Sequence, residues 1–134
     1  MGNRAVITFE TATTSPCIYL HWNGGRASVE AFLRAGRDLS IRGGATADQQ
    51  AKALDALAER IGRFFFGNEV GFTIYRETYG RSDTDNGDNG VYVIGHDMEI
   101  VRRLHHSRYG EELNAEKTAA IYEQIMARAP VFND

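Results

Sequence analysis

Two apolar runs near the start of the chain predict two β-strands. Residues 4–9 form an apolar run rich in β-branched and aromatic side chains, and residues 17–22 form a second one. The Thr-rich stretch between them ends in Pro16, which cannot donate a hydrogen bond within a sheet. Two such strands with a short polar connection favour an antiparallel hairpin.

Apolar residues recur at helical spacing after Gly25. Val29, Phe32 and Leu33 lie three and four residues apart, which predicts a helix that starts near Ser28. A second helix is expected from Thr46 to just before Gly67. Thr46 and Gln49 have the spacing of a capping box, in which each side chain bonds a backbone N–H of the other.

The second half returns to strands and ends in a helix. Residues 70–79 show a mixed alternation of apolar and polar side chains, which suits a strand with at least one face in water, and residues 91–94 are a short apolar run. Residues 98–104 predict a third strand, with a short helix as the alternative. A last helix, capped by Asn114, is expected over residues 115–128.

The resulting element order is ββααβββα, with strands and helices in blocks. Such an order predicts an α+β fold, here an antiparallel sheet of about five strands with about three helices packed on it. No repeat or long linker divides the chain, so residues 1–134 are expected to form one domain.

Composition excludes a few classes of protein. Hydrophobic residues make up 43% and charged residues 25%, which argues against wholesale disorder. A net charge of −3 disfavours a non-specific nucleic-acid binder. The single cysteine, Cys17, cannot form an internal disulfide, and we interpret it as a buried, inert thiol rather than a nucleophile. Without a long apolar segment or a signal-like start, the protein is expected in the cytoplasm.

The most unusual stretch is acidic and contains Asp83, Asp85 and Asp88. Such density suits Ca²⁺, but the EF-hand pattern fails in both registers. Counted from Asp83, Asp88 replaces the glycine and Ile94 the final glutamate; counted from Asp85, Gly90 is correctly placed but His96 replaces the glutamate. Because two Asn-Gly dipeptides lie within it, a solvated loop between strands is the favoured interpretation. A weak metal site and an acidic patch that meets a basic partner remain as alternatives.

The other candidates are basic residues and histidines. Arg102, Arg103 and the residues that follow them are the densest positive run, which suits phosphate binding or, by preference, the protection of an edge strand. His96, Asp97 and either His105 or His106 offer an acid–base or metal centre only if the fold brings them together. No known catalytic motif is present, and neither a metal nor a cofactor is expected.

Three stretches carry a resemblance: Asn3 to Phe9; Ile18 to Gly25 with Ser28 to Leu33; and Asp83 to Ile94 with Glu99 to Val101. Together they resemble a family of small, mostly uncharacterised proteins carried by phages, plasmids and integrated elements of bacteria. The similarity covers most of the chain and is weakest at the C-terminal helix. It implies a setting in which small proteins often bind and block a host defence component, as anti-CRISPR proteins do.

We therefore expect a non-catalytic binding protein that inhibits a host protein or a protein–nucleic-acid complex. The expected binding residues are Tyr79, Arg81, Asp83, Asp85, Asp88, Arg102 and Arg103. A direct contact with nucleic acid is the less favoured mode, no membrane contact is expected, and the oligomeric state is open. The alternative is a small metal-dependent or nucleic-acid-processing enzyme that uses the acidic loop and nearby histidines. A third hypothesis is a homo-oligomer built on Phe64 to Phe66.

Overall fold

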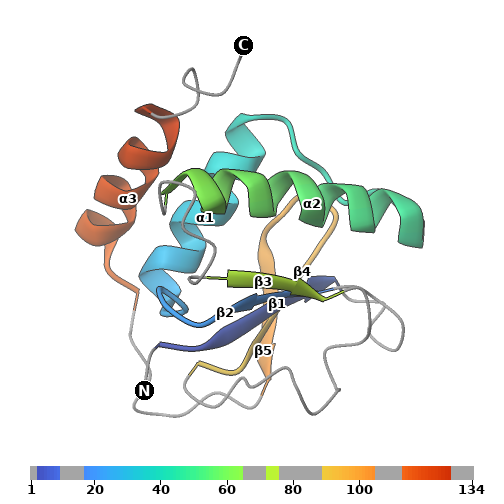
Figure 1. Ribbon diagram of the computed structural model, residues 1–134, viewed down its shortest axis with the longest axis horizontal. Coiled ribbons are helices and arrows are strands. Elements are labelled where there is room, and N and C mark those ends of the chain that lie inside the picture. The colour runs from blue at the N-terminus through green and yellow to red at the C-terminus, as the bar shows by residue number, and fades with distance from the viewer. Residues whose placement is uncertain (1–2, 10–16, 65–71, 76–88, 105–112, 128–134) are drawn as a thin grey trace.

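The computed structural model describes residues 3–9, 17–64, 72–75, 89–104 and 113–127 (Figure 1). Its elements follow the predicted order ββααβββα. They are β1 (Ala5–Phe9), β2 (Cys17–Leu20), α1 (Arg26–Asp38), α2 (Ala47–Phe64), β3 (Phe72–Tyr75), β4 (Val91–Ile94), β5 (Ile100–Leu104) and α3 (Ala115–Ala127). The α+β class and the three helices are as expected.

The sheet is mixed, so the prediction of an antiparallel sheet is wrong. Its strand order is β3-β2-β1-β4-β5. Neighbouring strands are antiparallel except for β1 and β4, which run parallel with Val6 opposite Val91 and Phe9 opposite Ile94. The antiparallel pairing of β1 with β2 confirms the predicted hairpin.

Burial explains why β1 and β4 occupy the middle of the sheet. All five residues of β1 and all four of β4 are buried. A strand that is covered on both faces reads as a continuous apolar run, and such strands are typical of parallel pairs. The two runs predicted strands correctly, but an apolar run carries no information about strand direction.

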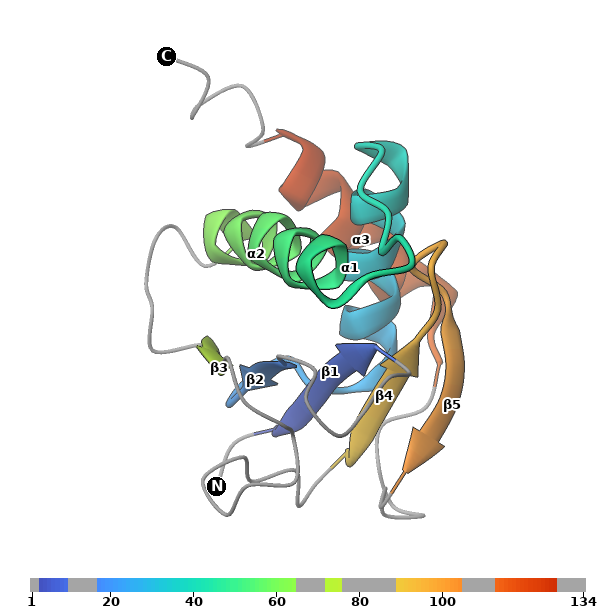
Figure 2. The ribbon, with the colours of Figure 1, turned by 90° about the vertical axis from the view of Figure 1, so that its right-hand side faces the viewer.

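The three helices lie on one face of the sheet, as predicted (Figure 2). The main core forms between this face and the helices, with Ile7, Ile18 and Tyr92 from the sheet and Phe32 and Leu57 from α1 and α2. Burial of these large apolar side chains is the main source of stability. Phe64 is partly buried on this core, where its ring meets the ring of Phe32 edge-on at 5.8 Å, while Phe65 and Phe66 lie outside the described residues.

A smaller buried cluster lies on the opposite face of the sheet. Its members are Val6, Cys17, Val91 and Val93, with Tyr19 and Leu104 packed against it. Cys17 is buried, as predicted.

Local hydrogen bonds fix the helix ends. In α2, the N–H of Gln49 donates to Thr46 Oγ1 at 3.2 Å and the N–H of Thr46 donates to Gln49 Oε1 at 3.1 Å, which confirms the capping box. Asn114 caps α3 by accepting from the N–H of Lys117 at 3.0 Å. The first helix starts at Arg26 rather than near Ser28, because Gly25 is its N-cap and Ser28 is buried inside the helix.

Polar contacts join helix α3 to α1 near both ends of α1. Thr118 Oγ1 donates to the carbonyl of Ala27 at 2.8 Å, next to the start of α1. Near the end of α1, the hydroxyl of Tyr122 donates to the carboxylate of Asp38, and the guanidinium of Arg34 lies 4.0 Å from the centre of the Tyr122 ring. Over the described ranges, no helix combines the length and apolar character needed to cross a bilayer.

Candidate functional site

The predicted binding residues fall into two groups. Tyr79, Arg81, Asp83, Asp85 and Asp88 lie outside the described residues. Arg102 and Arg103 lie on β5, the edge strand of the sheet next to β4. The described strands that precede and follow the acidic segment in the chain, β3 and β4, are not neighbours in the sheet.

Arg103 is engaged within the chain. Its guanidinium lies 4.1 Å from the centre of the Tyr92 ring, and its Nη2 donates to the carbonyl of Asn89 at 2.8 Å. The hydroxyl of Tyr92 in turn donates to the carbonyl of Gly24 at 2.8 Å. Arg102 faces the other way and is exposed. Of the two arginines, Arg102 is therefore the one whose side chain is presented to solvent.

Asn89 connects this arginine to the start of β1. It directly follows the acidic segment and is fully buried. Its Nδ2 donates to Asn3 Oδ1 at 2.5 Å and to the carbonyl of Arg4 at 3.1 Å. The described residue next to the acidic segment is therefore anchored at the end of the sheet where the central strand β1 begins.

Asn3 continues this connection to the end of β2. Its N–H donates to the carbonyl of His21 at 2.8 Å, and its carbonyl accepts from the N–H of Gly24 at 2.7 Å. A Cβ atom on Gly24 would lie within 2.8 Å of Ala5 Cβ and closer still to the Asn3 carbonyl oxygen. Glycine is required here because the two backbones approach so closely. The loop that carries Trp22 is thus held on both sides.

Trp22 is the exposed residue of this loop. It is 46% exposed and is the only tryptophan in the chain. The next residue, Asn23, has a positive φ of 59° and donates from Nδ2 to Ser28 Oγ at 3.2 Å. Asn tolerates the left-handed region better than most residues, so the turn into α1 is well defined. A large aromatic side chain therefore stands exposed on a fixed backbone.

Two further rings support Trp22. The ring of His21 meets the indole edge-on, with 5.1 Å between centroids and 83° between planes. His21 Nδ1 and the Tyr19 hydroxyl are hydrogen-bonded at 3.1 Å, and their rings lie 6.3 Å apart. Tyr19, His21 and Trp22 therefore form a connected series of aromatic side chains at the end of β2.

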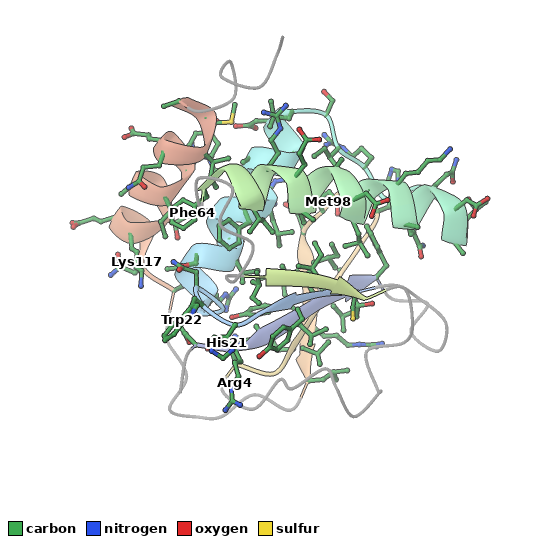
Figure 3. All side chains as sticks on the ribbon, viewed as in Figure 1. Arg4, His21, Trp22, Phe64, Met98 and Lys117 are labelled. Atoms are coloured by element: carbon green, nitrogen blue, oxygen red, sulfur yellow. The ribbon has the colours of Figure 1, made fainter. Side chains whose placement is uncertain are left out.

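Two basic side chains lie on the same side of the molecule as this series. Figure 3 shows Arg4, His21 and Trp22 gathered at one end of the sheet, with Lys117 of α3 on the same side. Lys117 is exposed, and the neighbouring Thr118 is bonded to Ala27 near the start of α1. Leu113, just before α3, is 54% exposed. We call Arg4, His21, Trp22 and Lys117 the Trp22 surface.

Sequence interpretation missed Trp22 as a candidate because residues 17–22 were taken as one strand. The strand ends at Leu20. The signal was present in the sequence, since a tryptophan directly before Asn-Gly-Gly falls at a turn, where a side chain is seldom fully covered.

Two residues of the enzyme alternative, His96 and Asp97, lie at the far end of the β4–β5 pair. His96 and Asp97 are exposed in the turn between these strands. The Nδ1 of His96 accepts from the N–H of Gly44 at 2.9 Å, and its carbonyl accepts from the N–H of Gly43 at 2.8 Å. His96 thus holds this turn against the connection between α1 and α2.

The described residues do not assemble a centre around His96. His105 and His106 lie outside them, and Leu104, the last residue of β5, pairs with Val91 at the end of the strand pair away from His96. Within the described ranges, no three His, Cys, Asp or Glu side chains converge as a metal ion would require.

Comparison of the chain with protein-family models, with curated proteins and with solved structures finds no match.

Proposed function

We propose that this chain is a binding protein without catalytic activity that engages and inhibits a host protein or protein–nucleic-acid complex. The Trp22 surface is the proposed contact. The observation that carries the proposal is the exposure of Trp22, 46%, on a loop that Asn3 and Asn23 hold in place. Exposed Trp and Arg side chains are enriched among residues that dominate binding energy. A fixed backbone lowers the entropy that is lost on binding.

The setting implied by the resemblance supports the inhibitory role. Small proteins of mobile elements often act by occupying a surface of a host defence component, which requires a contact surface and no catalytic group. The acidic segment that contains Asp83, Asp85 and Asp88 remains a second proposed contact. It is followed directly by Asn89, whose side chain donates hydrogen bonds to Asn3 and to the carbonyl of Arg4. Asn3 in turn holds the loop that carries Trp22.

The test is to use the purified chain as bait in lysate of a bacterial host and to identify the retained complex by mass spectrometry. We expect Trp22→Ala to abolish retention, because it removes the central aromatic side chain. Val101→Ala is the matched control, since Val101 is 50% exposed on β5, outside the Trp22 surface. A combined Asp83→Asn, Asp85→Asn and Asp88→Asn variant tests the acidic segment separately.

Retention by Val101→Ala and loss with Trp22→Ala would support the proposal. If Trp22→Ala retains the complex as well as the unmodified chain, the Trp22 surface is not the contact. Loss with the acidic-segment variant alone would assign binding to that segment.

A further inference from the structure

We infer that His96 is a pH-sensitive latch, which holds the connection between α1 and α2 (residues 39–46) on the β4–β5 turn and releases it when the imidazole is protonated. The latch consists of the two hydrogen bonds that His96 accepts from Gly43 and Gly44. It lies where the parallel strands β1 and β4 end, whereas the frame of the Trp22 loop lies where β1 begins. The inference therefore goes beyond the proposed function and does not depend on it.

The hydrogen bond between His96 and Gly44 requires the neutral imidazole. The backbone N–H of Gly44 donates to Nδ1 of His96 at 2.9 Å. A backbone N–H can only donate, so Nδ1 carries no proton and the proton of the neutral ring is on Nε2. When the ring takes up a second proton, both of its nitrogens become donors. Two donors then face each other, and this bond is lost.

The connection is fixed at its two ends by bonds that do not involve His96. The N–H of Ile41 donates to a carbonyl of α1 at 2.9 Å, and the N–H of Ala45 donates to a side chain in the first turn of α2 at 2.8 Å. Between these points, the N–H groups of Gly43 and Gly44 donate to the carbonyl and to Nδ1 of His96. Two adjacent glycines give this part of the backbone the freedom to move when the latch opens.

Backbone strain on both sides of the contact favours opening. Ser40 in the connection has a φ of 65°, and Met98 in the turn has a φ of 66°. This left-handed region is costly for residues other than glycine and asparagine, and it persists only where surrounding contacts impose it. Arg37 Nη1 donates to the carbonyl of Met98 at 3.0 Å and keeps the turn on α1. The part that moves is therefore the connection.

The closed latch covers one end of the main core. Phe9 is the last residue of β1 and is 1% exposed. A Cβ atom on Gly43 would overlap the Phe9 ring, so the connection lies directly against this ring. Release of the connection would uncover it.

The direction of the pH dependence follows from the charge of the ring. Charged groups on the elements that meet at the latch are Asp97 and Glu99 after β4, Arg37, Asp38 and Arg42 at the end of α1, and Asp48 at the start of α2. Carboxylate and guanidinium groups ordinarily keep their charge between about pH 5 and pH 8, whereas histidine changes its charge there. The latch is therefore closed at the upper end of this range and opens as the pH falls.

Amide hydrogen exchange, followed by nuclear magnetic resonance together with the titration of the His96 ring, tests the latch in the unmodified chain. We expect the protection of the Gly43 N–H, relative to its intrinsic exchange rate, to fall by about 2- to 13-fold as the ring becomes charged. Gly43 bonds to the carbonyl of His96 and not to the ring, so it loses protection only if the connection moves. The control is Gly24, whose N–H donates to the carbonyl of Asn3 at 2.7 Å and should keep its protection.

Substitutions of His96, an exposed residue, separate the charge of the ring from its position. In His96→Asn, Oδ1 takes the place of Nδ1 as an acceptor and does not titrate, so we expect Gly43 to stay protected throughout. In His96→Ala the acceptor is missing, so we expect low protection at both ends of the titration. Asp97→Asn, next to the latch, is the control and should keep the pH dependence.

Three results would overturn the inference. The first is unchanged protection of Gly43 while the His96 ring titrates. The second is a loss confined to Gly44, which would mean that the bond to the ring breaks without releasing the connection. The third is the same pH dependence in His96→Asn as in the unmodified chain, which would assign the effect to another group.

Discussion

Tyr122 links α3 to α1 through a hydrogen bond to a carboxylate, and this bond raises the pKa of the Tyr122 hydroxyl above its ordinary value of 10.0. The bond to Asp38 is the main cause. Burial and the negative charge of Asp38 act in the same direction, while Arg34 opposes them. The folded chain therefore holds this proton more tightly than the unfolded chain does.

The sign of the pH dependence follows from this shift. The stabilisation from the bond is complete below pH 10.0 and is lost as the pH rises through the raised pKa of the folded chain. We expect Asp38→Asn to bring the pKa of Tyr122 back towards its ordinary value. The ultraviolet absorbance of tyrosinate, followed during alkaline titration, measures this change.

Tyr122→Phe is the control that assigns this signal among the six tyrosines, because it removes the transition of Tyr122 alone. If subtracting the Tyr122→Phe titration leaves a transition at or below the ordinary value, the hydrogen bond to Asp38 does not persist in solution.

Residue-level chemistry was the hardest part to predict from the sequence. The burial of Cys17 followed from its apolar neighbours and is confirmed. The role of Asn89 could not be predicted, because it depends on Asn3, which is far away in sequence and is brought to it by the pairing of β1 with β4. Arg103 was taken as a binding residue from local charge, whereas its contact with Tyr92 depends on the register of β4 and β5.

At the scale of elements, the capping box at the start of α2 gives a prediction of stability. Thr46 Oγ1 accepts from the N–H of Gln49, one of the backbone groups that the helix itself leaves without a partner. We expect Thr46→Ala to lower the free energy of unfolding by about 1 kcal/mol. Chemical denaturation followed by circular dichroism measures this loss.

Lys52→Ala on an exposed position of the same helix is the matched control, and we expect a change of no more than about 0.5 kcal/mol. An equal effect of the two substitutions would mean that the side chain of Thr46 adds nothing as a cap.

Element positions were predictable wherever a local signal was strong. The caps at Thr46 and Asn114 depend on residues within one helical turn, so the sequence contains all of the information. The start of α1 was placed too late, because Ser28 is a favoured N-cap residue in isolation. In the folded chain Gly24 must pack against Asn3, and this contact leads the chain into α1 at Arg26.

At the scale of the whole molecule, the central position of β1 predicts where the sheet is most sensitive to substitution. Ile7 is fully buried between β2 and β4 and belongs to the main core. We expect Ile7→Ala to lower the free energy of unfolding by about 2–5 kcal/mol, because it leaves a cavity that the neighbouring strands cannot close. Urea denaturation measures this loss.

Ile100→Ala is the matched control on the edge strand β5, where the side chain is only partly buried. The same chemical change should cost less there, because the edge can relax into the gap. A loss at Ile100 as large as that at Ile7 would show that the edge strand is packed as tightly as the centre.

Strand direction was the part of the architecture that the sequence could not supply. The blocks of strands and helices predicted the class of fold, and the apolar runs predicted the strands. The pairing of β1 with β4 is a contact between distant segments, and it is decided by which apolar runs are covered on both faces. Burial on both faces appears only once the chain is folded.

The parallel pairing of β1 and β4 also sets a delay during synthesis. Val6 lies opposite Val91, so β1 is synthesised roughly 4–17 s before its partner, at a rate of about 5–20 residues per second. During that interval β2 can pair with one edge of β1, while the other edge has no strand of its own chain to bind. An open apolar edge is a site of aggregation. The yield of soluble protein should therefore respond to translation speed and to chaperones more strongly than that of a sheet built from hairpins alone.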